Sequence, residues 1–219
     1  MKRDHYYSEK ELRSIATDLT SAEVIPVNVE IEAEHRVLDL SEVEKIIKHS
    51  ENIFIQDCGC RSQFHNCDAP LDTCLVVNVG ADYAEKWPNN HSRRVDVDEA
   101  LRALRRSHEA GLVHMAYVSK GDQEPQLICS CCTCCCHTLG GLIRHGIHTK
   151  VLTSKLIAED NEAICTDCGK CIKRCVFWAR LIVDGEKRYD KLRCFGCGLC
   201  ASTCPTNAIK LVDRKKTLN

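Results

Sequence analysis

The sequence predicts an α/β domain of about 150 residues followed by a smaller, cysteine-rich module. Two observations predict this division. Up to about residue 150, segments with the two-residue period of strands alternate with segments that have the helical period. Closely spaced cysteines follow from residue 165, and residues 150–161 are expected to be a linker. We therefore expect one domain at residues 1–155 and a second at residues 156–219.

The elements of the first domain follow from their local signals. Helices are expected at residues 8–20, from a capping box at Ser41–Glu44, at residues 94–110 with Asp96 as N-cap, and after Gly140-Gly141. Strands are expected at residues 24–31, 52–55, 75–79, 112–118 and 126–129.

Cysteines cluster in the second domain in two copies of the run C-x2-C-x2-C-x3-C. Three thiolates at this spacing can bind three corners of one iron–sulfur cubane, while the fourth cysteine serves the other cluster. Cluster one is then expected on Cys165, Cys168, Cys171 and Cys204, and cluster two on Cys175, Cys194, Cys197 and Cys200. Zinc sites built from C-x2-C pairs are the alternative, but two such pairs supply the four ligands of zinc and leave the third and fourth cysteines of each run unexplained.

These runs resemble the two-[4Fe-4S] ferredoxins of bacteria and archaea. The resemblance covers about the last sixty residues and implies a small α+β, ferredoxin-like domain that carries single electrons at low potential. Val176 stands where the motif has proline, whereas Pro205 keeps it in the second run. Phe177 and Trp178, beside Cys175, are expected to shield cluster two from water.

A second set of cysteines lies in the α/β domain, at the ends of predicted strands. Its members are Cys58, Cys60, Cys67, Cys74, Cys129, Cys131, Cys132, Cys134, Cys135 and Cys136. Because one sheet can bring distant loops together, we expect these thiols to converge. They predict one or two further iron–sulfur centres, with adjacent cysteines shared between centres or bridging one larger cluster.

Other interpretations of this set remain open. Zinc could be bound by Cys58, Cys60 and partners, and two or three of the thiols could be core residues. His65 and His137 lie beside the cysteines and could ligate a metal. Arg61 could donate to cluster sulfur, or could form an exposed ion pair.

The α/β domain also resembles a known family. The pieces Cys58-Gly-Cys60-Arg61, Cys67 to Leu75 and Ile128 to Cys136 are similar to those of multi-cysteine ferredoxin-like proteins from anaerobic bacteria and archaea. The match runs from about Val37 to the C-terminus and implies 4Fe-4S binding.

Composition narrows the functional classes. The net charge is −1, the aromatic content is 5%, and the longest basic run is Arg214-Lys215-Lys216, so we expect no nucleic-acid partner. We also expect no membrane span and no signal segment. Adjacent cysteines would pair wrongly in an oxidising compartment, so we expect the cytoplasm of an anaerobic bacterium or archaeon.

The sequence therefore predicts an iron–sulfur electron-transfer protein that serves redox partner proteins. Electrons would pass between the ferredoxin clusters and the additional centres, and no catalytic residue is assigned. One alternative is a reductase whose N-terminal cluster has an open site for a disulfide or small molecule. A redox sensor and a metal-handling accessory protein are the others.

Overall fold

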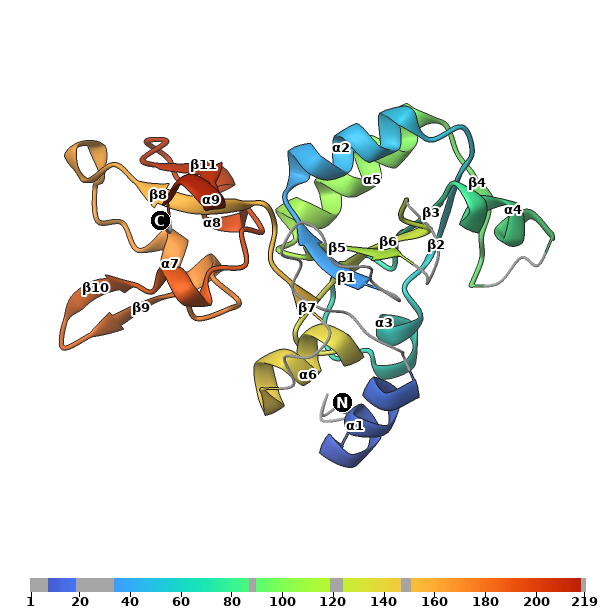
Figure 1. Cartoon of the computed structure of the whole chain (residues 1–219), viewed down its shortest axis with the longest axis horizontal. Coiled ribbons are helices and arrows are strands. Elements are labelled where there is room, and N and C mark those ends of the chain that lie inside the picture. Colours follow the sequence, from blue (N-terminus) through green and yellow to red (C-terminus); the bar gives the residue numbers. More distant parts are fainter. Residues whose placement is uncertain (1–7, 19–33, 87–89, 119–123, 147–150, 218–219) are drawn as a thin grey trace.

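The computed structural model describes residues 8–18, 34–86, 90–118, 124–146 and 151–217 (Figure 1). A seven-stranded sheet dominates the N-terminal part, and a small module with two two-stranded sheets lies beside it. The expected mixture of helices and strands is therefore present. The strand expected at residues 24–31 lies outside the described residues.

The large sheet has the strand order β4-β2-β3-β6-β5-β1-β7. Its strands are β1 (Glu34–Leu38), β2 (Ile53–Asp57), β3 (Asp72–Val77), β4 (Arg93–Arg94), β5 (Val113–Val118), β6 (Leu127–Cys131) and β7 (Val151–Leu152). All neighbouring strands pair antiparallel except β1 and β7, which are parallel. The N-terminal part thus mixes helices with a mainly antiparallel sheet.

The two faces of this sheet are covered by different helices (Figure 1). The helices are α1 (Glu9–Asp18), α2 (Leu40–His49), α3 (Gly59–Phe64), α4 (Val79–Lys86), α5 (Val97–Glu109) and α6 (His137–His145). Helices α2 and α5 bury Val43, Ile47 and Leu104 against one face. On the other face, Val113 and Met115 pack against Leu139 of α6. Because strand side chains alternate, β6 turns Ile128 toward α5 and Cys131 toward α6.

Several expected helix starts are confirmed and others are wrong. Asp96 is the N-cap of α5 and accepts a hydrogen bond from the Glu99 amide at 2.7 Å. The capping box of α2, however, is formed by Asp39 and Glu42, and Ser41 donates to the Asp39 carboxylate instead of capping. A carboxylate at the earlier position can accept from both the backbone and the hydroxyl, so the helix begins sooner.

Other differences also have local causes. Helix α6 begins at His137, capped by Cys136, and so contains the two glycines after which it was expected. Asn78 adopts a left-handed conformation (φ 53°), which ends β3 at Val77 and lets α4 follow. The expected linker contains two strands, β7 and β8 (Leu156–Asp160).

The C-terminal module is built from two antiparallel pairs of strands and short helices. It contains β8, the turn η1 (Glu162–Ile164), α7 (Lys170–Arg174), β9 (Arg180–Val183), β10 (Glu186–Tyr189), η2 (Lys191–Arg193), α8 (Leu199–Ser202), β11 (Ile209–Asp213) and α9 (Arg214–Thr217). Strand β8 pairs with β11, and β9 with β10. The domain boundary at residues 155 and 156 stays a prediction, although β7 joins the large sheet and β8 the small one.

The two parts of the chain contact each other through hydrogen bonds and apolar side chains. Arg174 donates to the carbonyl oxygens of His108 and Glu109, at 2.7 and 2.5 Å, and so caps the C-terminal end of α5. Gly111 has φ 87°, and a side chain there would meet the Arg174 guanidinium. His108 also lies within hydrogen-bond distance of the Ser202 hydroxyl, 2.8 Å away.

Candidate metal centres

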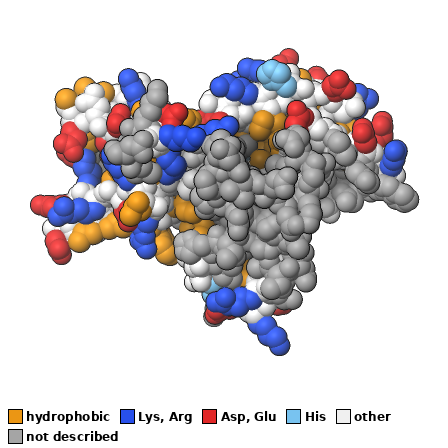
Figure 2. All heavy atoms as spheres, in the orientation of Figure 1, with side chains coloured by type: hydrophobic (Ala, Val, Ile, Leu, Met, Phe, Trp, Pro, Cys, Tyr) orange, Lys and Arg blue, Asp and Glu red, His pale blue; other side chains and the backbone are white. Residues whose placement is uncertain are grey.

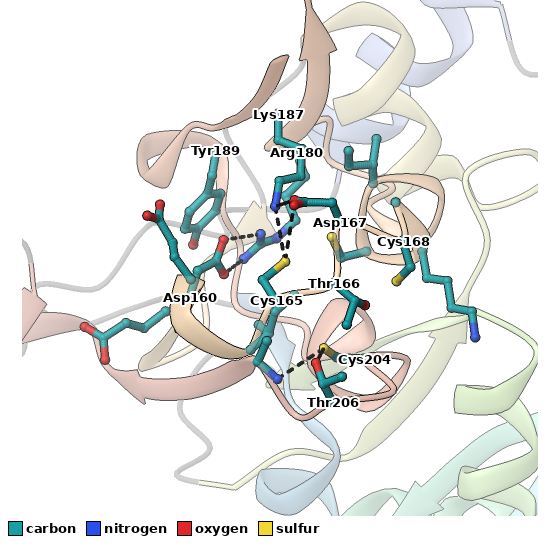
Figure 3. Close-up of a pocket in the computed structure, with 18 of the residues that line it drawn as sticks. Asp160, Cys165, Thr166, Asp167, Cys168, Arg180, Lys187, Tyr189, Cys204 and Thr206 are labelled. Carbon is teal, nitrogen blue, oxygen red and sulfur yellow. Dashed lines mark hydrogen bonds and ion pairs between the residues drawn. The ribbon is translucent and has the colours of Figure 1, made fainter. Parts of the chain in front are cut away.

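The first ferredoxin run forms an open cavity of about 570 Å³ in the C-terminal module (Figure 3). Its lining includes all four cysteines expected to hold cluster one: Cys165, Cys168, Cys171 and Cys204. Cys168 is exposed and the other three are half-buried. Cys204 therefore returns from the second run to the cysteines of the first, as the crossed pattern predicts.

Charged side chains of both signs line this cavity (Figure 3). Lys187 donates to Sγ of Cys165 at 3.2 Å and forms an ion pair with Asp167. Arg180 makes two hydrogen bonds to the Asp160 carboxylate, at 2.5 and 2.7 Å, and stacks over the Tyr189 ring. These cations would stabilise a bound cluster, whose thiolates and sulfides carry net negative charge.

Backbone amides also point at the sulfur of Cys204. The Ala208 N–H donates to its Sγ at 3.2 Å. Burial works to raise the pKa of this thiol, but amide N–H groups, including those of Thr206 and Ala208, outweigh it, so the pKa is lowered. Hydrogen bonds of this kind favour the thiolate, the form that ligates iron.

The second ferredoxin run forms a narrower cavity in the interior. Its lining includes the four cysteines expected for cluster two: Cys175, Cys194, Cys197 and Cys200. Burial raises the pKa of both Cys197 and Cys200, the latter to about 11. Cys194 and Cys200 are buried, so the thiols of this cavity are less exposed than those of the first.

Aromatic residues separate this second cavity from solvent. Phe177 is buried and stacks on Phe195, with ring centroids 4.4 Å apart. Trp178 is 55% exposed and adopts a left-handed backbone (φ 53°), so the expectation that it shields cluster two is wrong. Phe195, for which the sequence predicted no role, packs on Phe177 beside cluster two instead. Hydrophobic side chains are visible on the outer side of the C-terminal module in Figure 2.

The ten N-terminal cysteines converge on the sheet face that carries α3 and α6. Cys74, Cys129 and Cys131 come from strands β3 and β6, while Cys58 and Cys136 are the N-caps of α3 and α6. The register that pairs Leu75 with Ile128 places Cys74 beside Cys129, and their Sγ atoms are 3.8 Å apart. The predicted convergence of strand-end cysteines is thus present in the structure.

The thiols fall into two groups. Six of them form a closed ring in which each thiol neighbours the next, in the order Cys58, Cys60, Cys136, Cys131, Cys129, Cys74 and back to Cys58. We call this group the thiol ring. The remaining four, Cys67, Cys132, Cys134 and Cys135, gather with all Sγ atoms within 4.8 Å of one another. We call this group the thiol quartet.

Arg61 lies between the thiol ring and the thiol quartet. It is only 1% exposed and donates to the carbonyl oxygens of Pro70 and Ser130, at 3.0 and 2.8 Å. Its Nη1 is also 4.0 Å from Sγ of Cys132. No carboxylate in the described ranges forms an ion pair with Arg61, which rules out the alternative of an exposed ion pair there.

The charge of Arg61 acts on thiols of both groups. Burial works to lower the pKa of Arg61, but negative charge on Cys58 and Cys132 outweighs it and raises the pKa. The pKa of Cys132 is lowered to about 4 by a hydrogen bond from Cys134, with a further contribution from Arg61. Positive charge from Arg61 thus favours the thiolate form of Cys58 and of Cys132, one thiol in each group.

The two candidate histidines are placed differently. His137 Nδ1 is 3.4 Å from Sγ of Cys60, at the edge of the thiol ring. His65 is the C-cap of α3 and adopts φ 48°. Only His137 is thus brought against a thiol by a contact seen in the described residues.

Comparisons with known proteins agree with the C-terminal sites. Residues 187–210 match the 4Fe-4S binding domain. Pyruvate synthase subunit PorD of Methanothermobacter marburgensis is 42% identical over 52 residues, which are 24% of this chain and 59% of that protein. Indolepyruvate oxidoreductase subunit IorA of Pyrococcus horikoshii is 32% identical over 146 residues, 57% of this chain and 20% of that protein.

A third relative is matched over most of its length. The ferredoxin MJ0722 of Methanocaldococcus jannaschii is 38% identical over 58 residues, which are 24% of this chain and 75% of that protein. The chain spans less than two thirds of PorD and IorA. None of the helices in the described ranges is long and apolar enough to cross a membrane. The cysteine runs, the cavities they line and these similarities together place the chain in a multi-cysteine, ferredoxin-like family that binds 4Fe-4S clusters.

Proposed function

We propose that this iron–sulfur protein carries electrons between its exposed cluster one and a further iron–sulfur centre in the thiol ring, with cluster two as the intermediate. One observation carries the proposal. A single packed apolar cluster contains Cys131 and Cys136 of the thiol ring, and Cys175 and Cys197 of cluster two pack against it. The side chains that would ligate the two centres therefore pack on the same apolar cluster, which can separate the two centres without a layer of water.

The proposed electron path through the C-terminal module runs from the surface to the interior. Cluster one, on Cys165, Cys168, Cys171 and Cys204, would face solvent through the large cavity. Cluster two, on Cys175, Cys194, Cys197 and Cys200, would lie deeper, behind the stacked pair Phe177 and Phe195. An external redox protein can then reach cluster one, whereas cluster two exchanges electrons internally.

The chemistry of the thiol ring favours a polynuclear centre. A single tetrahedral ion uses four thiolates, so a ring of six neighbouring thiols has more ligands than one ion needs. Thiolates are soft ligands that select iron–sulfur clusters, zinc or copper(I). Four of the six ring cysteines are buried, and Arg61 compensates negative charge beside Cys58. A low-polarity, cation-compensated site of this kind suits electron storage.

The relatives suggest the class of partner. PorD and IorA are named as subunits of pyruvate synthase and indolepyruvate oxidoreductase. We therefore infer that this chain exchanges electrons with an oxidoreductase protein or subunit. The many unpaired thiols favour a reducing, oxygen-poor cytoplasm as its location.

The proposal is tested on the full chain, purified and kept without oxygen. Two ferredoxin clusters account for eight irons, so we expect clearly more than eight per chain. Stepwise reduction followed by electron paramagnetic resonance should show a signal that Cys129→Ser removes. Cys168→Ser is the matched control, because it changes an exposed ligand of cluster one and should leave that signal in place.

Three results would contradict the proposal. The first is an iron content of eight or less in fully loaded protein. The second is a Cys129→Ser variant that keeps every signal of the wild type. In the third, an added disulfide or small ligand perturbs the ring signal and is turned over, which would instead support the reductase alternative.

A further inference from the structure

The thiol quartet has a geometry different from every other cysteine group in the described residues. Its four Sγ atoms all lie within 4.8 Å of one another, and among the described residues it alone meets this criterion. Cys67 and Cys132 are 3.8 Å apart at Sγ, and Cys134 and Cys135 are 3.9 Å apart. These are short distances for four side chains that come from two separate loops.

The spacing matches a single tetrahedral ion. Zinc binds thiolate sulfur at about 2.3 Å, and tetrahedral geometry then places the sulfurs about 3.8 Å apart. The separations of 3.8 and 3.9 Å agree with this value, and no other pair of these sulfurs is more than 4.8 Å apart. Four thiolates complete the coordination, so no position stays open for water or substrate.

The ferredoxin cysteines in the same structure provide an internal comparison. In a cubane each thiolate binds a different iron, so the sulfurs are separated by the body of the cluster. The cluster-one cysteines line a cavity of about 570 Å³ and do not approach one another as closely as the quartet. The thiol quartet is too compact for a cubane without rearrangement.

We propose that Cys67, Cys132, Cys134 and Cys135 bind one zinc ion, separate from the iron–sulfur centre of the thiol ring. Zinc has no redox chemistry, and a closed site of four cysteines is typical of a structural ion. This inference does not depend on what the thiol ring binds.

The surroundings of the quartet fit a dianionic zinc–tetrathiolate unit. Arg61 Nη1 lies 4.0 Å from Sγ of Cys132 and supplies positive charge. Two further hydrogen bonds hold the backbone of the ligand loop: Asn66 Nδ2 donates to the Cys134 carbonyl at 2.9 Å, and Arg144 Nη1 to the Thr133 carbonyl at 2.7 Å. Such support around the ligands is expected of a metal site that must keep its geometry.

The position of the quartet indicates what the ion would do. Cys67 lies in the loop between α3 and β3, and Cys132, Cys134 and Cys135 lie between β6 and α6. Crosslinking these loops holds the end of α3 next to the start of α6, and the N-caps of these two helices are the ring ligands Cys58 and Cys136. The zinc ion would therefore hold the frame of the redox centre without taking part in electron transfer.

The test measures metal content and zinc coordination in full-length protein produced with both iron and zinc present. We expect about one zinc per chain, with X-ray absorption showing four sulfur neighbours and no metal neighbour. Cys67→Ser should reduce zinc to near zero. Cys67→His should restore zinc binding with one nitrogen and three sulfur neighbours, because histidine also ligates zinc, and this separates ligation from misfolding.

Two control variants complete the design. Cys168→Ser, in cluster one, and Cys129→Ser, in the thiol ring, should lower iron but leave zinc at about one per chain. The proposal is overturned if the wild type lacks zinc or holds iron in the quartet. It is also overturned if zinc has a metal neighbour, or if Cys129→Ser loses zinc while Cys67→Ser keeps it.

Discussion

Cys131 and Cys132 are adjacent in the chain, yet their side chains belong to different groups of thiols. The Cys131 thiol contacts Cys129 and Cys136 in the thiol ring, whereas Cys132 Sγ lies 3.8 Å from Cys67 in the thiol quartet. Cys131 is the last residue of β6, so its side chain follows the alternation of the strand. The side chain of Cys132 lies beyond the strand and no longer follows this alternation. The end of one strand thus separates the two groups of ligands.

Arg61, which lies between these groups, should control the potential of the N-terminal centre. Reduction adds negative charge, so a nearby cation favours the reduced state. We expect Arg61→Met to lower the potential of the ring centre by on the order of 100 mV, the size of one charge interaction across several ångströms at an effective dielectric of 20. Redox titration followed by electron paramagnetic resonance measures the shift.

The same substitution should also destabilise the fold, by about 3–5 kcal/mol, because it leaves buried carbonyl oxygens and thiolates without their cation. Arg61→Lys keeps the charge, so the potential of the ring centre should stay close to that of the wild type. An unchanged potential in Arg61→Met would show that the guanidinium does not face the centre.

Lys187 should act on cluster one in the same way but more weakly. Its ammonium donates to Cys165 Sγ at 3.2 Å, and its side chain is 40% exposed. Salt and water screen exposed charges, so we expect Lys187→Met to lower the potential of cluster one by roughly 10–30 mV at low salt. Arg188→Met is the control, because Arg188 lines the same cavity but its ion pair is with Glu186 and, among the described residues, it contacts no ligand sulfur. Equal shifts in both variants would contradict the assigned contact.

Cys204 should belong to cluster one despite lying in the second cysteine run. It lines the same cavity as Cys165 and Cys171. We expect Cys204→Ala to lose the signal of cluster one and keep that of cluster two, and Cys175→Ala to do the reverse. Iron analysis and electron paramagnetic resonance of both variants measure this. Loss of the same cluster in the two variants would refute the crossed ligation.

His114 should make the N-terminal part less stable in mild acid. Burial lowers its pKa from 6.5 to about 3, so the folded protein keeps it neutral. The unfolded chain binds a proton below pH 6.5, which means that stability falls as the pH drops from 6.5 toward 3. Between pH 6.5 and 5 the loss from this group is roughly 1–2 kcal/mol.

Anaerobic urea unfolding at several pH values tests this expectation. His114→Gln should flatten the dependence on pH, because glutamine has no titratable group. His91→Gln is the control, since the His91 side chain is 90% exposed. A slope that is the same in wild type and His114→Gln would assign the acid sensitivity to other groups.

The sequence predicted best what depends on local spacing. The two cysteine runs predicted which thiols share a cavity, because their geometry is set within a few residues. Asp96 was found as a cap for the same reason. Local signals failed where two of them competed: Ser41 carries a capping signal, but Asp39 forms the cap.

Tertiary packing decided what the sequence could not show. The division of the ten N-terminal cysteines into a ring and a quartet depends on the register of β3 against β6. The spacing of the cysteines along the sequence does not contain this register. The burial of Arg61 and the exposure of Trp178 likewise depend on distant elements. Phe195 joins Phe177 only because the two cysteine runs fold together.

The central claim is that electrons reach the thiol ring through cluster two. Full-length protein is mixed rapidly with a low-potential one-electron donor, frozen at successive times and examined by electron paramagnetic resonance. We expect the ring signal to appear in the wild type. Cys194→Ala removes a ligand of cluster two, so in this variant cluster one should still be reduced but the ring signal should be delayed. An equally fast ring signal in both proteins, or no signal in the wild type beyond the two ferredoxin clusters, would contradict the account.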